Sequence, residues 1–145
     1  MVFRVLNIAE KNDAAKGIAA IMSGGRAIRR EGKSKFNKIY EFPYNLLNQQ
    51  CQMIMTSVSG HLKELEFASN YKKWNSCLPS ALFRAPVTKD VRQDAKNIES
   101  TLKREVAKCN AIVIWTDCDR EGENIGFQII EVSIKDLLIL ILIFI

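Results

Sequence analysis

The stretch that decides the fold runs from residue 111 to residue 130. It reads AIVIW (111–115), then TDCDREGEN (116–124), then IGFQII (125–130). An unbroken apolar run is typical of a strand covered on both faces of a parallel sheet. The apolar residues after position 124 recur at helical spacing, so the whole segment predicts strand, loop and helix. The loop carries four carboxylates, at positions 117, 119, 121 and 123.

This acidic loop needs an electrostatic explanation. Carboxylates about 4–6 Å apart raise one another's pKa and destabilise the loop that holds them. A divalent cation offsets the repulsion, and Mg²⁺ prefers carboxylate oxygens together with water. The helix dipole is the weaker alternative, because it stabilises each acid in a first helical turn by only about 0.3–1 kcal/mol. The Asp-x-Asp-x-Glu spacing of Asp117, Asp119 and Glu121 therefore favours a magnesium site.

The beginning of the chain repeats the same order of elements. Residues 2–8 predict a strand, and an apolar stripe over residues 14–22 predicts a helix capped by Asn12 or Asp13. In open α/β sheets, ligands bind beyond the carboxyl ends of the strands. If the two strands are parallel neighbours, Glu10 faces the acidic loop. It could then work as a general acid–base while the other carboxylates hold the metal.

The middle of the chain predicts further elements. Residues 39–42 and 52–58 are strand candidates, and an apolar stripe from Val91 to Val106 predicts an amphipathic helix of about 18 residues. Trp74 is expected to be half-buried as a packing anchor, as is Phe83. A base-stacking surface beside the neighbouring lysines is the alternative for Trp74.

Composition and charge bound the class of protein. A chain of 145 residues, 48% hydrophobic and 26% charged, suits one folded domain and excludes disordered and collagen-like chains. The net charge of +5 is a mild bias toward polyanions. Residues 26–38 carry six cations and one acid, so we expect a flexible basic loop that either contacts phosphate or is merely solvated. Four cysteines without a CxxC pair, beside one histidine, exclude a zinc finger and indicate reduced, intracellular thiols.

Three ordered motifs carry a family resemblance. VLNIAEK (5–11), TSVSGHL (56–62) and DCDREGEN (117–124) together resemble the Toprim domain of type IA DNA topoisomerases, over about residues 1–131. NDAAK (12–16) and SKFNK (34–38) are similar to the eukaryotic topoisomerase III alpha branch of that family. The resemblance implies a Toprim-like (Rossmann-like) α/β fold. It predicts a mostly parallel sheet flanked by helices and incomplete at the C-terminus.

The resemblance also implies the chemistry of the carboxylates. Enzymes of this family pass one DNA strand through a transient break in another, with magnesium and a covalent 5′-phosphotyrosine. By position, Glu10 would be the acid–base at the leaving and returning 3′-oxygen, with Lys11 beside it. Asp117 and Asp119 would hold Mg²⁺, supported by Glu121, with Glu10 also among the ligands.

Contacts with DNA are implied in the same way. Lys11 and Arg120 would touch the scissile phosphate region, and His61 would lie near the DNA. For a lone histidine after Gly60, a structural hydrogen-bonding role stays open as well. The three tyrosines lie in no matching motif, so the resemblance implies that the nucleophile is not in this chain. Such a fragment would be inactive alone.

Partners and location follow from the family only. Single-stranded or negatively supercoiled DNA would be the substrate, helicase and scaffold proteins would be partners, and no membrane is involved. The nucleus, and secondarily the mitochondrion, would be the location, and DNA recombination the process. Two alternatives stay open: a non-catalytic Toprim module that binds magnesium or DNA, and another Toprim enzyme such as a nuclease or primase.

The end of the chain differs from the rest. Residues 137–145 read LLILILIFI, which is too short for a transmembrane helix of about 20 residues. A buried parallel strand and an abnormal end both explain this run. It has neither alternation nor a polar face, so nothing fixes its register and we expect it to promote aggregation. We therefore predict a Toprim domain over residues 1–132 and an atypical apolar tail over residues 133–145.

Overall fold

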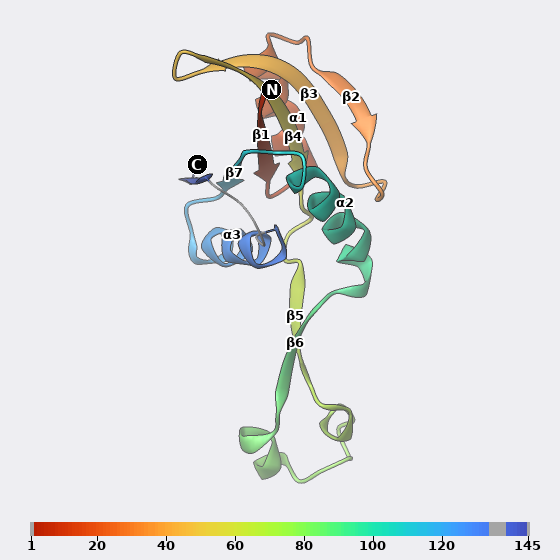
Figure 1. Ribbon diagram of the computed structural model, residues 1–145. Helices are drawn as coiled ribbons and strands as arrows, with labels where there is room; N and C mark the ends of the chain where they lie inside the picture. Colours follow the sequence, from red (N-terminus) through yellow and green to blue (C-terminus); the bar gives the residue numbers. More distant parts are fainter. Residues whose placement is uncertain (1, 134–138, 145) are drawn as a thin grey trace.

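The computed structural model describes residues 2–133 and the backbone of residues 139–144. A six-stranded sheet in the order β2-β3-β4-β1-β7-β8 forms the body of the domain (Figure 1). Three of its five strand pairings are parallel, which confirms the predicted mostly parallel α/β fold. The strands are β1 (Phe3–Ala9), β2 (Ile28–Glu31), β3 (Lys38–Leu46), β4 (Gln49–Ser57), β7 (Ala111–Thr116) and β8 (Ile139–Phe144).

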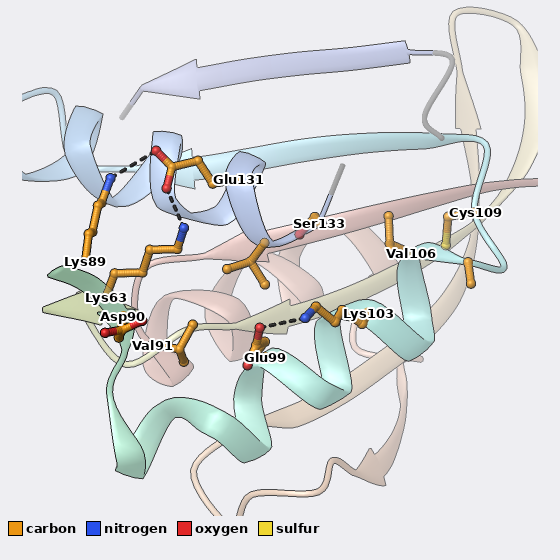
Figure 2. A pocket seen from close by; sticks show the side chains of 12 residues that line it. Lys63, Lys89, Asp90, Val91, Glu99, Lys103, Val106, Cys109, Glu131 and Ser133 are labelled. Carbon is orange, nitrogen blue, oxygen red and sulfur yellow. Dashed lines mark hydrogen bonds and ion pairs between the residues drawn. The ribbon is translucent and has the colours of Figure 1, made fainter. Parts of the chain in front are cut away.

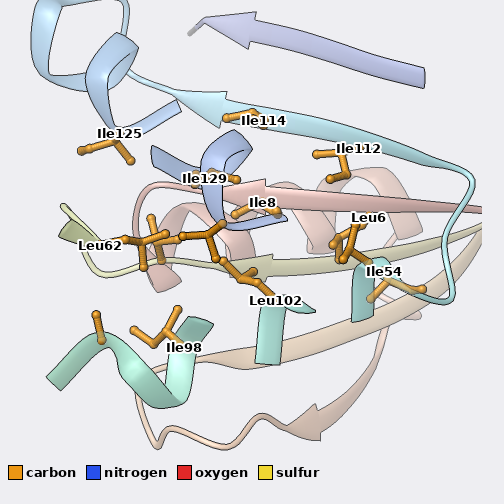
Figure 3. Packing of buried hydrophobic residues seen from close by; sticks show 14 of the residues in the cluster. Leu6, Ile8, Ile54, Leu62, Ile98, Leu102, Ile112, Ile114, Ile125 and Ile129 are labelled. Carbon is orange, nitrogen blue, oxygen red and sulfur yellow. The ribbon is translucent and has the colours of Figure 1, made fainter. Parts of the chain in front are cut away.

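Helices cover both faces of this sheet because its central strands are apolar on both sides. Helix α1 (Asn12–Ser23) packs against β1, β3 and β4 on one face. Helices α2 (Lys96–Val106) and α3 (Arg120–Ser133) cover the other face. Figure 3 shows this second core, in which Leu6 and Ile8 of β1 meet Leu102 of α2 and Ile129 of α3. The alternate β1 residues Val5 and Ala9 belong to the α1 side, as the two-residue period of a strand requires.

The basic run over residues 26–38 contains a strand, so the prediction of a flexible loop is wrong for part of it. Strand β2 pairs antiparallel with β3 at one edge of the sheet. Within it, Arg30 Nη2 lies 2.6 Å from Glu105 Oε2 of α2, and Arg30 Nε donates to Glu41 Oε1 at 2.7 Å. Glu105 has no exposed surface. Arg30 is therefore a structural cation that ties the sheet edge to α2.

Two helix boundaries differ from those predicted. Neither Asn12 nor Asp13 caps α1, because Lys11 occupies the N-cap position. The side chain of Lys11 makes no capping hydrogen bond. The predicted long helix begins at Lys96, after a short 3-10 turn at Gln93–Ala95. Val91 belongs to a strand instead, although it occupies the helical stripe of the sequence. Hydrophobic spacing alone did not locate this boundary.

A two-stranded ribbon projects from the body of the domain (Figure 1). It consists of β5 (Lys63–Phe67) and β6 (Val87–Val91), paired antiparallel. Residues 68–86 connect them through the 3-10 turns η1 (Ser69–Tyr71) and η2 (Pro79–Arg84). Trp74 is 96% exposed and Phe83 is 94% exposed, so the prediction that both are packing anchors is wrong.

The apolar end of the chain forms a strand over part of its length. Strand β8 pairs in parallel with β7, from Ala111 with Ile139 to Thr116 with Phe144. Residues 134–138 and 145 lie outside the described residues, so the predicted tail over 133–145 stays a prediction. In the described part of the chain, no helix is long and apolar enough to cross a membrane.

The buried ion pair of α2 generates the first prediction. Burial alone would raise the pKa of Glu105, but hydrogen bonds from Arg30 and Arg104 hold it below its ordinary value of 4.5. Glu105→Gln should lower the free energy of unfolding at pH 7 by about 1–3 kcal/mol, because charge-assisted hydrogen bonds are lost. A carboxylate with a lowered folded-state pKa stabilises the fold above its unfolded-state pKa. The difference between wild type and variant should therefore shrink as the pH falls below about 4.5.

Urea unfolding at pH 7 and at acid pH measures this difference. Glu99→Gln is the matched control, because Glu99 forms an i,i+4 pair with the exposed Lys103. Such a pair contributes only about 0.3–0.5 kcal/mol. A loss at Glu105 no larger than that at Glu99 would contradict a structural role for the Arg30 pair.

Candidate active site

Three loops meet at one edge of the sheet. Strand β1 pairs in parallel with β4 on one side and with β7 on the other, so the carboxyl ends of all three lie together. Glu10 follows β1, the Gly60–His61 turn follows β4, and Asp117 follows β7. The condition set by the sequence is confirmed, because the two strands that precede the predicted carboxylates are parallel neighbours. This edge is where ligands bind in open α/β sheets.

Glu10 is the central residue of this edge. Its backbone N–H donates to the Trp115 carbonyl at 3.0 Å, and its own carbonyl accepts from the Gly60 N–H at 3.3 Å. Its side chain lies beneath the acidic loop, where the Asp117 N–H donates to Glu10 Oε2 at 3.4 Å. The residue is only 7% exposed. The backbone thus fixes a largely buried carboxylate between the two neighbouring loops.

Lys11 provides the positive charge at this position. Its Nζ lies 3.2 Å from Glu10 Oε1 and 3.5 Å from Asp117 Oδ2. Its hydrogen bond to Glu10, together with the charges of Glu10 and Asp117, raises the pKa of Lys11 above its usual value. The ammonium group bridges two carboxylates from different loops. This arrangement indicates that the pair of carboxylates can share a cation.

Asp119 begins helix α3 as its N-cap. Its Oδ1 accepts a hydrogen bond from the Gly122 N–H at 2.7 Å, and its carbonyl accepts from the Glu123 N–H at 3.0 Å. The Asp119 N–H donates in turn to the Asp117 carbonyl at 2.9 Å. One carboxylate oxygen of Asp119 is therefore committed to the helix. Helix capping therefore accounts in part for the presence of an acid at position 119. A role at the start of a helix was the alternative to metal binding in the sequence analysis.

Gly122 permits the tight turn of the acidic loop. A Cβ atom at this position would collide with the carbonyl oxygen of Asp117. No rotation of a side chain relieves such a collision, because the obstructing atom belongs to the backbone. The glycine of the sequence DCDREGEN is thus needed to fold the loop back onto the start of α3.

His61 is held by a buried glutamine of α3. Gln128 Nε2 lies 3.1 Å from His61 Nδ1, and Gln128 Oε1 accepts from the backbone N–H groups of Leu62 at 2.8 Å and Lys63 at 3.0 Å. The other ring nitrogen, His61 Nε2, lies 3.6 Å from Glu121 Oε1. The ring is therefore both a structural hydrogen-bonding group and a neighbour of the acidic loop.

Sequence reasoning missed Gln128 and Gly122. Gln128 stands within the apolar helix IGFQII (125–130), so a polar residue in an otherwise apolar segment was the visible signal. A buried amide in that place needs hydrogen-bond partners, and the backbone after β4 supplies them. Only the tertiary structure identifies these partners.

The predicted metal ligands are brought to one edge but not to one point. Glu10 and Asp117 share Lys11, Asp119 caps α3, and Glu121 approaches His61. Among the residues that the structure describes, no three His, Cys, Asp or Glu side chains converge as a metal-binding group. Arg120 is exposed at the first turn of α3, close to these acids in sequence.

The described part of the domain contains several cavities, and two of them are large. A hollow of about 420 Å³ opens beside Lys11 and Gly60, and the basic Lys35 also lines it. A second cavity of about 650 Å³ lies between β6, α2 and the end of α3, where Glu131 pairs with Lys63 and Lys89 (Figure 2). The acidic loop lines neither of them, so it stands at the surface of the domain.

Comparison with known proteins agrees with this geometry. The family model described as "Toprim domain" matches residues 5–139. The chain belongs to the Toprim family. DNA topoisomerase 3-alpha of Homo sapiens is 59% identical over 131 residues, which are 90% of this chain and 13% of the human protein. The protein of the same name from Arabidopsis thaliana is 54% identical over 88% of this chain and 14% of its own length.

A fungal relative is more distant. DNA topoisomerase 3 of Saccharomyces cerevisiae is 39% identical over 87% of this chain and 20% of its own length. The predicted resemblance to Toprim domains of the topoisomerase III branch is thereby confirmed. This Toprim chain spans only about an eighth of the length of its human relative.

Gly122 gives a prediction with a control in the same helix. Gly122→Ala should lower the free energy of unfolding by about 1–3 kcal/mol, because the loop must move away from the new methyl group. Gly126→Ala is the control, since its Cβ would lie 3.9 Å from Ile114 Cγ2, an ordinary contact. Alanine also favours helix over glycine by about 0.5–1 kcal/mol, so the control should be neutral or stabilising. Equal thermal unfolding of the two variants would contradict the close approach.

Proposed function

We propose that this chain is the Toprim part of a type IA DNA topoisomerase. The whole enzyme would relax or decatenate DNA by magnesium-dependent breakage, passage and rejoining of a single strand. One observation carries this proposal: a largely buried Glu10 carboxylate, bridged by Lys11 to Asp117, lies at the carboxyl ends of three parallel strands. The names of the relatives support the reaction class.

Glu10 would move the proton at the 3′-oxygen of the broken strand. During cleavage a tyrosine oxygen from another part of the enzyme would bond to phosphorus, the bond between phosphorus and the 3′-oxygen would break, and Glu10 would give a proton to that 3′-oxygen. During rejoining the 3′-hydroxyl would attack phosphorus, the tyrosine oxygen would leave, and the Glu10 carboxylate would take the proton back. Burial and fixed backbone bonds suit this role, because a positioned acid–base group typically contributes 10²–10⁴-fold to a rate.

Asp117 and Asp119 would hold Mg²⁺, with Glu10 and Glu121 in support. The donor set fits this ion, because all four side chains supply the carboxylate oxygens that it prefers. Lys11 already bridges Glu10 and Asp117 as a cation, which supports shared binding of positive charge there. When bound, the ion would supply electrostatic stabilisation of the scissile phosphate. Asp119 keeps one oxygen free of its capping bond to Gly122 for such a contact.

Single-stranded or negatively supercoiled DNA would approach over the same edge. Lys11 and Lys35 line the hollow beside Gly60, and their charges suit a phosphate. Arg120 would add a second contact from the start of α3, and His61 would lie against the nearby strand. These side chains position the backbone of the nucleic acid and carry no information on its sequence.

The covalent nucleophile would come from another part of the enzyme. The tyrosines of this chain belong to none of the three motifs, so this chain alone should neither relax DNA nor form a covalent adduct with it. We further propose a nuclear location, with the mitochondrion as a second one, a role in DNA recombination, and helicase and scaffold proteins as partners. All of these follow from the topoisomerase class.

Calorimetric titration of Mg²⁺ tests the metal site in the isolated chain. Asp117→Asn/Asp119→Asn should abolish a weak binding isotherm that the wild type shows. Glu64→Gln/Asp90→Asn is the matched control, because it removes the same charge from exposed acids of the β5–β6 ribbon. Equal heats from the wild type and the Asp117→Asn/Asp119→Asn variant would contradict the magnesium assignment.

A chimera tests the reaction. Residues 2–132 of this chain would replace the matching segment of human DNA topoisomerase 3-alpha. The chimera should relax negatively supercoiled plasmid with Mg²⁺, and Glu10→Gln should slow relaxation by about 10²–10⁴-fold while DNA binding stays nearly unchanged. Glu64→Gln, an exposed acid of β5, is the control.

Two outcomes would count against the assignment. Full activity of the Glu10→Gln chimera would remove Glu10 from the chemistry. Nicking without relaxation by the isolated chain would indicate a Toprim nuclease instead.

A further inference from the structure

The ribbon formed by β5 and β6 has no core of its own. From residue 63 to residue 94 no residue is buried, whereas Leu62 and Ala95 on either side belong to the main core. A two-stranded ribbon alone is only marginally stable in water. Its base is anchored by Glu131 of α3, which pairs with Lys63 at 2.6 Å and with Lys89 at 3.0 Å. The ribbon is therefore in contact with the body of the domain at its base and uncovered at its far end.

Large apolar side chains gather on this ribbon. Trp74 and Phe83 are almost fully exposed, and Leu78 is 76% exposed. The other exposed apolar residues of the ribbon are Leu65, Phe67 and Val87. Exposed apolar side chains that occur singly need no explanation, but a concentration of this kind marks an interaction surface. We call residues 68–86, which contain Trp74, Leu78 and Phe83, the ribbon tip.

The charge of the ribbon tip is of one sign. It contains Lys72, Lys73 and Arg84 but no aspartate or glutamate. Lys72 pairs with Glu66 of β5, which leaves Lys73 and Arg84 facing outward. A complementary surface would be apolar at its centre and carry carboxylates at its rim.

We propose that the ribbon tip is the docking surface for the part of a type IA topoisomerase that lies outside its Toprim segment. The occupant is an apolar protein surface rimmed by carboxylates, supplied by the same polypeptide in proteins of full length. The length of the relatives supports this choice, since the matched segment is only 13% of the human protein. The inference rests on the proposed function, because it takes the partner surface from the same class of enzyme.

Single-stranded nucleic acid is the competing occupant, and the side chains favour protein. Bases stack on aromatic rings, and Trp74 and Phe83 offer such rings beside lysines. Leu65, Leu78 and Val87 have no flat face for a base, yet they are exposed on the same ribbon. Burial of aliphatic side chains against a protein surface explains these residues as well as the aromatic ones.

Trypsin measures whether the ribbon tip is accessible, because trypsin cleaves after lysine and arginine. The tip contains three such residues, Lys72, Lys73 and Arg84. In the isolated 145-residue chain these bonds should be cut rapidly. In the chimera with human DNA topoisomerase 3-alpha, cleavage at the same bonds should be slower by about tenfold or more, since docking reduces the population of the open form. Mass spectrometry of timed digests identifies each cut.

Substitution of the tip separates docking from general stability. Trp74→Ala/Phe83→Ala should restore rapid cleavage in the chimera, while the melting temperature of the isolated chain stays unchanged. The matched control is Ile21→Ala/Leu47→Ala, which truncates two exposed apolar residues of α1 and the β3–β4 turn. This control should leave the chimera protected.

Three outcomes would overturn the proposal. In the first, trypsin cleaves the ribbon tip of the chimera as fast as that of the isolated chain. In the second, the tip of the chimera stays protected from trypsin after Trp74→Ala/Phe83→Ala. In the third, the tip of the chimera is protected only after an oligothymidylate is added. The last outcome would assign the tip to nucleic acid. Relaxation by the same chimera is a separate measurement, so a protected but inactive chimera refutes the proposed function and leaves the docking surface standing.

Discussion

The parallel pairing of β1 with both β4 and β7 is the constraint on which the rest of the structure depends. It brings the carboxyl ends of three strands to one edge, although Glu10 and Asp117 lie 107 residues apart in the sequence. The backbone of Glu10 then bonds to Trp115 on one side and Gly60 on the other. The Asp117 N–H and the Lys11 ammonium group contact its carboxylate, which therefore lies against the acidic loop.

Charge is distributed so that the fold tolerates this crowded edge. Lys11 lies between Glu10 and Asp117, the start of α3 takes up Asp119, and His61 approaches Glu121. Lys11 serves two of these acids and the other two have partners of their own, which limits the repulsion among them. A divalent cation that enters this edge would compete with Lys11 for Glu10 and Asp117, and the free oxygens of the acids remain available to such a cation.

The sheet and the projecting ribbon differ in how many apolar side chains they bury. The sheet between α1 and the α2–α3 pair has two apolar cores, and the buried Arg30–Glu105 pair ties its edge to α2. The ribbon beyond Leu62 has no core of its own, and at its base Glu131 pairs with two lysines and Val91 packs against the main core. The body of the domain therefore buries its own apolar residues, whereas the ribbon tip leaves Trp74, Leu78 and Phe83 exposed.

The sequence by itself determined the strand–loop–helix order at both ends of the domain, and it singled out Glu10 and the acidic loop as candidates for the site. These features are local patterns: continuous apolar strands, the acidic loop, and Glu10 directly after the first strand. Each depends only on residues that are adjacent in the sequence, so it can be recognised without a structure. The bounds of α2, the strand β2 and the exposure of Trp74 were decided only by tertiary structure. Spacing cannot tell a residue packed against the sheet from one on a projecting ribbon, and Gln128 acquires its role only because His61 folds against it. Side-chain burial and long-range hydrogen bonds involve residues that are far apart in the chain. These contacts exist only once the sheet has formed, so local patterns do not reveal them.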